Sequence, residues 1–216
     1  VIVATHKKYL MPSDNVYLPV HVGGGLCDND FGYQKDSTGD NISQKNPYFC
    51  ELTGLYWAWK NLDSDYIGLV HYRRYFTLHK HIPKDSTKKF ALVLSGSEIN
   101  DLLKNTEVIL PKKRKYYIEN LYDHYKHTMY VEPLDETRKI IEEKYPEYLK
   151  EFDNLKKRTS AHMFNMFIMK KEMLNDYCTW LFDILFELEK TIDSDKYDSF
   201  HKRFYGRISE LLLDVY

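Results

Sequence analysis

Three cationic side chains stand close together directly after a short apolar run. Residues 67–70 are typical of a buried strand, and His71, Arg73 and Arg74 follow at once. Adjacent arginines at the end of a buried strand are costly to desolvate unless an anion meets them. In open α/β sheets, ligands bind at the carboxyl ends of strands. The stretch 65–76 therefore predicts an anion site at a strand end.

A second polar group ends the first predicted strand. Residues 1–5 are β-branched or small, which favours a strand, and Thr5 and His6 stand at its carboxyl end. In a nucleotide-binding α/β domain this position contacts the base or the ribose. An ordinary polar loop is the alternative interpretation.

A loop rich in glycine and aspartate runs over residues 23–46, which is unusually long for a compact domain and favours a functional role. Its glycines could let the backbone approach a ligand, but the GxGxxG spacing of a dinucleotide site is absent. Asp28 and Asp30 match the DxD pattern of a metal-binding motif, but no apolar strand precedes them. We therefore do not favour a divalent cation, and we assign no metal ligand. Asp40 and Asn41 lie further along the loop.

One helix is predicted over residues 46–61, with Asn46 as its N-cap and Pro47 in its first turn. Helical spacing predicts one buried stripe, made of Phe49, Leu52, Tyr56 and Trp59. Trp57 lies off this stripe and is either surface packing or a platform on which a sugar stacks. Glu51 either favours the helix dipole or serves as a catalytic carboxylate.

Residues 112–115 are four consecutive cations followed by two tyrosines. Such a run can bind phosphates or an anionic membrane leaflet, and a solvated loop is the alternative. Next, Asp123 and His124 lie in a polar helix that could contact an acceptor. His127 is one turn from His124, but no third zinc ligand is evident.

A dense apolar strand over residues 161–169 begins beside His162 and contains Asn165. A buried Asn must find a partner, so Asn165 either orders the backbone or contacts a ligand. Two helices follow, at about 171–192 and 198–215, with Arg203 on the flank of the second.

The 216 residues, 43% hydrophobic and 29% charged, predict one α/β domain over 1–216, with a mostly parallel sheet flanked by helices and a helical region at 171–216. A net charge of -1 gives no basic field, so we expect no nucleic-acid partner. The three widely spaced cysteines indicate reduced thiols and a cytoplasmic protein. No apolar run approaches the length of a membrane-spanning helix.

Several blocks of the chain resemble one known family. They are DNIS at 40–43, YWAWKN at 56–61, GLVHYRRYF at 68–76, NMFIMKKE at 165–172 and a looser RxxGxxSELL at 203–212. They are similar to a bacterial capsular and exopolysaccharide glycosyltransferase family, long catalogued as a domain of unknown function. The resemblance implies a GT-A-like, Rossmann-like fold. It also implies transfer of a sugar, such as galactofuranose or galactose, from a UDP-sugar to a growing, often lipid-linked glycan.

Ordinary GT-A enzymes hold a divalent cation at the pyrophosphate with a DxD at a strand end. Here the corresponding strand ends in cations, and a guanidinium can stabilise a leaving diphosphate directly. We expect Arg73 or Arg74, with His71 and Arg203, to do the work of the metal. Because side chains alternate along a strand, we expect one arginine to reach the ligand and the other to pair with Glu51 or Glu210.

An inverting transfer needs a base for the acceptor hydroxyl, and Asp40, Glu51, Asp123 and His124 are the candidates, with a slight preference for Asp40. Donor contacts are expected from Thr5, His6, Asn41, His71, Arg73, Arg74 and Arg203. Acceptor or sugar contacts are expected from Trp57, Tyr72, Asp123, His124, His162 and Asn165.

Two other classes of protein fit the same residues. One is a non-catalytic nucleotide- or glycan-binding domain, and the other is a phosphoesterase that uses His71 and the arginines. The residues alone predict an α/β domain with an anion site at a strand end. The step to a glycosyltransferase rests on the resemblance.

Overall fold

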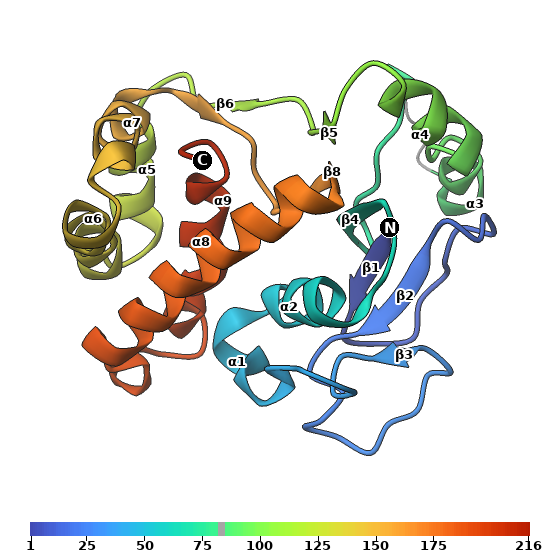
Figure 1. Ribbon diagram of the computed structural model, residues 1–216, viewed down its shortest axis with the longest axis horizontal. Helices are drawn as coiled ribbons and strands as arrows, with labels where there is room; N and C mark the ends of the chain where they lie inside the picture. The colour runs from blue at the N-terminus through green and yellow to red at the C-terminus, as the bar shows by residue number, and fades with distance from the viewer. Residues whose placement is uncertain (82–84) are drawn as a thin grey trace. The chain divides into compact units, whose positions relative to one another are not determined.

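The computed structural model describes residues 1–81 and 85–216, without the side chains of residues 86 and 87 (Figure 1). The chain forms two compact units, and each unit is made of three separate segments of the sequence. The sheet unit comprises Val1–Asn46, Cys50–Pro111 and Met166–Leu174. The helical unit comprises Pro47–Phe49, Lys112–Asn165 and Asn175–Tyr216. One domain over residues 1–216 stays a prediction.

The sheet unit is built on six strands in the order β3-β2-β1-β4-β8-β5. Strands β3, β2, β1 and β4 pair in parallel, and β8 runs antiparallel to both β4 and β5. This arrangement confirms the predicted α/β class with a mostly parallel sheet. The strands are β1 (Ile2–Thr5), β2 (Leu18–His21), β3 (Gln34–Lys35), β4 (Tyr66–His71), β5 (Val108–Ile109) and β8 (Phe167–Lys170).

The four parallel strands end at one edge of the sheet. Thr5 pairs with His21, His21 pairs with Lys35, and Ala4 pairs with His71. The last residues of the four strands therefore stand side by side. We call this the carboxyl edge, and its members are Thr5, His21, Lys35 and His71.

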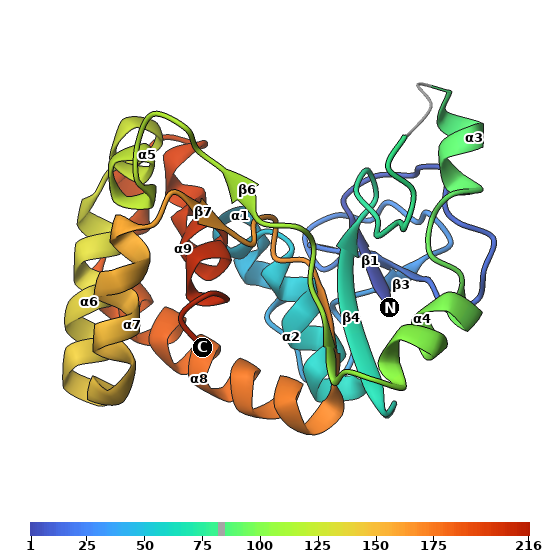
Figure 2. The same ribbon diagram turned by 90° about the horizontal axis from the view of Figure 1, so that it is seen from above.

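Helix α2 (Leu52–Asn61) covers one face of the sheet, beside β1 and β4 (Figure 2). Gly54 in its first turns lies against β2, where a Cβ would come 2.8 Å from Cγ1 of Val22 and 3.8 Å from Cγ1 of Val20. The missing side chain lets the helix lie close to the strands. Because Val22 directly follows β2, the amino end of α2 lies at the carboxyl edge.

The helix predicted over 46–61 is broken in the structure. A 3-10 turn, η1 (Ser43–Lys45), leads into the short α1 (Asn46–Phe49), and Cys50 then takes a left-handed φ of 53° before α2 begins. The side chain of Asn46 donates to the carbonyl of Cys50 (2.8 Å) and to Oγ1 of Thr53 (3.1 Å). Asn46 therefore stabilises the break instead of capping one long helix.

The buried face of α2 differs from the predicted stripe. Leu52, Leu55 and Trp57 are buried, whereas Tyr56 and Trp59 are half-buried. The predicted stripe was wrong for Tyr56 and Trp59, because α2 packs on the strands with the side that carries Gly54 and Ala58. The remaining helices of the sheet unit are α3 (Ser86–Phe90) and α4 (Gly96–Leu103).

The helical unit contains a short antiparallel ribbon, β6 (Arg114–Lys115) paired with β7 (Ser160–Ala161). Its helices are α5 (Leu121–Thr128), α6 (Glu132–Lys144), α7 (Pro146–Lys157), α8 (Lys171–Thr191, begun in the sheet unit), η2 (Ser194–Lys196), η3 (His201–Arg203) and α9 (Phe204–Leu212). Phe49 stacks on Tyr205 in its core, with ring centroids 4.3 Å apart. The predicted helical C-terminal region is confirmed. In the described ranges, no helix is both long and apolar enough to cross a bilayer.

Candidate functional site

Aromatic rings and cations gather around Tyr72 at the carboxyl edge. The buried ring of Tyr72 meets His6 and Tyr9 edge-on, with centroids 5.4 Å and 5.0 Å away. Nζ of Lys7 lies 5.5 Å and Cζ of Arg73 lies 5.0 Å from the centroid of the same ring. Lys7 and Arg73 are exposed, so their charges are available to a ligand. We call these five residues the Tyr72 cluster.

A tight turn presents the arginines. The N–H of Arg74 donates to the carbonyl of His71 (2.8 Å), and the N–H of His71 donates to the carbonyl of Arg74 (3.1 Å). Strand β4 therefore ends at His71, with Tyr72 and Arg73 at the tip of a two-residue turn. Both arginines are exposed. Neither arginine lies in β4, so strand alternation does not decide which of them faces a ligand, and a contact by only one of them stays a prediction.

His71 and Glu51 share one face of the sheet at the carboxyl edge. Leu69 and His71 pair with Ile2 and Ala4, and Ile2 faces Gly54 of α2. Side chains two residues apart share a face, so His71 lies on the face that α2 covers. Glu51 is the N-cap residue of α2, and both residues are half-buried.

Asp36 organises the loop that follows β2. Its fully buried carboxylate accepts hydrogen bonds from the N–H groups of Gly23 (2.8 Å) and Gly24 (2.9 Å). The hydroxyls of Ser43 (2.5 Å) and Thr53 (2.6 Å) complete the set. Four donors thus hold one carboxylate and tie this loop to α2.

Gly23 and Gly24 in this loop are closely packed, whereas the sequence indicated that its glycines could let the backbone approach a ligand. Gly23 has a φ of 71°, and a Cβ there would lie 2.7 Å from Oδ1 of Asn46. At Gly24 a Cβ would come 3.0 Å from the side chain of Lys35. Because Asp36 accepts their N–H groups, the amides of Gly23 and Gly24 are directed inward.

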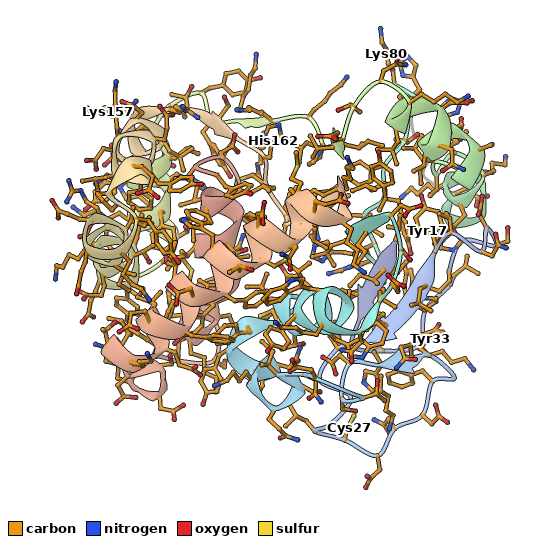
Figure 3. The ribbon with its side chains drawn as sticks, in the orientation of Figure 1. Tyr17, Cys27, Tyr33, Lys80, Lys157 and His162 are labelled. Atoms are coloured by element: carbon orange, nitrogen blue, oxygen red, sulfur yellow. The ribbon has the colours of Figure 1, made fainter. Side chains whose placement is uncertain are left out.

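Thr5 shapes the turn that carries three members of the Tyr72 cluster, His6, Lys7 and Tyr9. Its buried Oγ1 donates to the carbonyl of Lys7 (2.7 Å) and accepts from the N–H of Lys7 (3.3 Å). These bonds give Thr5 a positioning role in the turn, and its contact with the donor stays a prediction. On the same turn, Tyr33 donates to the carbonyl of Tyr9 (2.7 Å) and so ties in the loop that carries Cys27 (Figure 3).

Asp40 is not brought to the carboxyl edge. The loop runs along α2. Near the start of the helix, the hydroxyl of Thr53 donates to Asp36, and at its end Nδ2 of Asn61 donates to the carbonyl of Asp40 (2.8 Å). Asn61 lies eight positions after Thr53 in the helix, which corresponds to about 12 Å along its axis. Asn41 turns back locally, with Nδ2 on the carbonyl of Gly39 (2.8 Å). The structure thus separates Asp40 and Asn41 from His71.

Trp57 is not a stacking platform. It is 4% exposed, and its Nε1 donates to Oγ1 of Thr38 (2.9 Å). Trp59 is the half-exposed indole of this helix, and Nζ of Lys60 lies 3.5 Å from its ring centroid.

In the helical unit, Asp123 and His124 have local partners. Asn120 caps α5 by accepting from the N–H of Asp123 (2.8 Å), and its Nδ2 donates to the Asp123 carboxylate (2.8 Å). Nδ1 of His124 and Nδ1 of His127 lie 2.7 Å and 2.5 Å from the two oxygens of Glu119. The hydrogen bond to His124 is the largest cause that lowers the pKa of Glu119, and the hydrogen bond to His127 is the second. Across the part of the chain that is described, no three His, Cys, Asp or Glu side chains are placed to hold a metal ion.

His162 and Asn165 are also held within the helical unit. The buried carboxylate of Asp214 accepts from the N–H of His162 (2.5 Å), lies 3.1 Å from its Nδ1 and pairs with Nζ of Lys113 (2.7 Å). Asn165 is buried, has a φ of 51° and donates from Nδ2 to the carbonyl of Gly206 (3.0 Å). This favours the backbone-ordering alternative for Asn165.

Two further residues of the helical unit complete the predicted set. Arg203 is exposed at the N-cap of α9. Glu210, which we expected to pair with an arginine of the strand end, lies 3.7 Å from Arg207, also in α9. Asp123, His124, His162, Asn165 and Arg203 thus belong to the helical unit, whereas the carboxyl edge belongs to the sheet unit.

His21 is a member of the carboxyl edge that sequence reasoning missed. It is 3% exposed, its ring packs against Phe31 at 4.4 Å, and Nε2 lies 3.8 Å from Sγ of Cys27. Burial lowers its pKa, against a smaller opposing effect of Asp36. Nδ1 finds no hydrogen-bond partner among the residues that are described. The available signal was its place at the end of a short, mostly apolar run, as for His71.

A model of one protein family, described as a domain of unknown function and named DUF4422, matches residues 1–216. The chain belongs to the DUF4422 family. Among proteins of curated function, none matches this DUF4422 chain.

One solved structure is similar over the full length of the DUF4422 chain. It is the apo structure of WbbM, named as a bifunctional glycosyltransferase, with 33% sequence identity and a TM-score of 0.90. The match covers 100% of this chain and 41% of that one. The similarity confirms the fold class, and the DUF4422 chain spans less than half of WbbM.

Proposed function

We propose that the DUF4422 chain is a glycosyltransferase that transfers a sugar from a UDP-sugar to a glycan acceptor. The observation that carries this proposal is the exposed cationic rim of the Tyr72 cluster, set at the carboxyl edge of a sheet whose fold matches a glycosyltransferase. The carboxyl edge is where open α/β sheets bind ligands. The resemblance to polysaccharide-biosynthesis enzymes supports galactose or galactofuranose as the sugar and bacterial surface polysaccharide as the product.

In this proposal the diphosphate of the donor lies against Lys7, Arg73 and Arg74. A guanidinium stacked on a ring is held in place before the ligand arrives, which lowers the entropy lost on binding. Arg73 is placed in this way over Tyr72. No divalent cation is required, because these cations face the charge that develops on the leaving oxygen.

The transfer itself needs one proton acceptor. The acceptor hydroxyl gives its proton to Glu51 or His71 as its oxygen bonds to the anomeric carbon. The bond from that carbon to the diphosphate breaks, and its electron pair leaves with UDP. We favour Glu51, because it lies at the amino end of α2 on the same face as His71, whereas Asp40 is bonded to the far end of α2.

The test is UDP release from a panel of UDP-sugars with glycan acceptors, with and without EDTA. We expect release with at least one donor, unchanged by EDTA. Replacement of Arg73 by Ala should lower kcat/KM about 100-fold, whereas Lys88→Ala, an exposed cation on α3, should leave it unchanged.

Other outcomes would contradict the proposal. UDP binding without turnover on any acceptor would favour the non-catalytic nucleotide-binding domain. Release of inorganic phosphate from simple esters would favour the phosphoesterase. Loss of activity in EDTA, restored by Mn²⁺ or Mg²⁺, would refute the role given to the arginines.

A further inference from the structure

Among the residues that the structure describes, the most exposed large apolar side chains stand next to four consecutive cations. Tyr117 is 90% exposed and Ile118 is 99% exposed. The side chains of Lys112, Arg114 and Lys115 before them are exposed as well. A fully solvated Ile and Tyr side by side have no role in the core of the helical unit, and we call residues 112–118 the basic loop.

The basic loop is anchored on both sides of its tip. Arg114 and Lys115 pair with Ala161 and Ser160 in the β6–β7 ribbon (Figure 2). The N–H of Tyr116 donates to the carbonyl of Thr159 (2.7 Å), and the N–H of Leu121 donates to that of Arg158 (2.8 Å). These two bonds bracket the tip at 117–118, which therefore projects from a fixed base.

Its charges are arranged so that the surface around the tip is cationic. Glu119, the carboxylate next to the tip, is engaged by His124 and His127. Lys113 pairs with the buried carboxylate of Asp214, and Lys112 and Lys115 are exposed on either side of it.

The neighbouring α7 extends this cationic surface. Lys157, the last residue of α7, is exposed and projects outward (Figure 3). It lines a pocket of about 320 Å³ together with Lys156, Asn120, Tyr122 and Asp153. The ribbon partner β7 follows α7 directly, so this pocket adjoins the base of the loop.

We propose that the basic loop docks the protein on the surface of an anionic lipid bilayer, with Tyr117 and Ile118 inserted among the headgroups. An aromatic ring with a polar tip suits the membrane interface, and an aliphatic neighbour adds apolar area beneath it. Cations beside such an anchor are attracted to anionic headgroups within a Debye length of the surface. The chain carries a net charge of only -1, so the attraction is local to this loop. The inference goes beyond the proposed transferase and does not depend on it.

The test is co-sedimentation with vesicles of phosphatidylcholine alone and of phosphatidylcholine with an equal part of phosphatidylglycerol, in the absence of any sugar nucleotide. We expect binding to the anionic vesicles that falls steeply as salt is raised. Each neutralised lysine should weaken the partition coefficient about five-fold. This factor corresponds to the loss of about 1 kcal/mol of attraction between one cation and the anionic surface. Lys112→Gln with Lys115→Gln should therefore weaken binding about 25-fold, and Tyr117→Ser with Ile118→Ser about ten-fold.

Matched variants separate the loop from a general effect of charge or hydrophobicity. Lys88→Gln with Lys89→Gln removes the same charge from α3, and Leu78→Ser removes an apolar side chain that is 61% exposed. Both controls should bind as the unchanged protein does, and Lys112→Arg with Lys115→Arg should restore binding. The substituted side chains are solvent-exposed, so unfolding midpoints should stay the same, which circular dichroism checks.

Three results would overturn the proposal. The first is no binding to anionic vesicles, or equal binding to the neutral ones. The second is full binding by either loop variant, and the third is equal weakening by the α3 control. Hydrogen exchange adds an independent readout, because vesicle binding should protect amides of residues 112–119, and protection confined elsewhere would refute the basic loop as the docking surface.

Discussion

The guanidinium of Arg73 lies over the ring of Tyr72, with Cζ 5.0 Å from the ring centroid. The two residues form the tip of the turn that closes β4, so the backbone and the ring together fix where this charge stands. Lys7 reaches the same ring from the turn after β1. One aromatic side chain thus aligns cations from two neighbouring strands.

The first prediction follows from this arrangement. Tyr72→Leu keeps an apolar side chain but removes the ring face, so Arg73 and Lys7 lose a shared support worth about 1 kcal/mol each. We expect the Kd for UDP to rise about ten-fold, measured by calorimetry. Tyr72→Phe keeps the ring face and serves as the control. An unchanged Kd in Tyr72→Leu would show that the ring does not position the cations.

The second prediction concerns Asp36. Asp36→Ala leaves two buried N–H groups and two hydroxyls without their acceptor. We expect a loss of about 4 kcal/mol in the free energy of unfolding, measured with urea. Ser43→Ala removes only one of the four donors and should cost about 1 kcal/mol. Equal losses in the two variants would contradict the central role of the carboxylate.

The third prediction uses two glycines with nearly the same positive φ. Gly23 and Gly32 have φ of 71° and 72°, but only at Gly23 would a Cβ meet another group, Asn46 at 2.7 Å. Gly32→Ala should cost about 1 kcal/mol for the left-handed backbone alone. Gly23→Ala should cost about 2 kcal/mol more, because the Asn46 side chain must also move. Urea unfolding of both variants measures the difference, and equal costs would show that the crowding at Gly23 is relieved freely.

The fold class could be predicted from the sequence, because the strands of the sheet are short apolar runs that end in polar residues. Residues 67–70 and 1–5 both show this pattern, and both strands lie in the parallel part of the sheet. The cations of the strand end were likewise visible as residue types. Their geometry was not, because no residue pattern indicates the tight turn in which the backbone of His71 pairs with that of Arg74.

The site depended on contacts between residues distant in the sequence. Asp36 bonds partners 13 and 17 residues away, at Gly23 and Thr53, and no spacing rule connects them. Asp40 belongs to a family-like block, but its bond to Asn61 removes it from the carboxyl edge. A local pattern therefore identified the loop but not which of its carboxylates is structural.

The last prediction concerns pH and His21. Burial lowers the pKa of His21 below its ordinary value of 6.5 in the folded protein. The unfolded chain therefore binds a proton in a range of pH where the folded protein does not, and stability is lost as the pH falls below about 6.5 towards the lower folded pKa. Burial is the largest cause, and the nearby carboxylates of Asp36 and Asp30 oppose it without reversing it. His21→Phe removes the titration, fits beside Phe31 and leaves no unpartnered Nδ1, so its free energy of unfolding should fall less between pH 7 and pH 5, a range set by that ordinary pKa. Urea unfolding at several pH values measures both slopes, with His81→Phe, at an exposed position, as the control. A slope that is the same in His21→Phe and in the unchanged protein would mean that His21 is not the group whose protonation opposes folding.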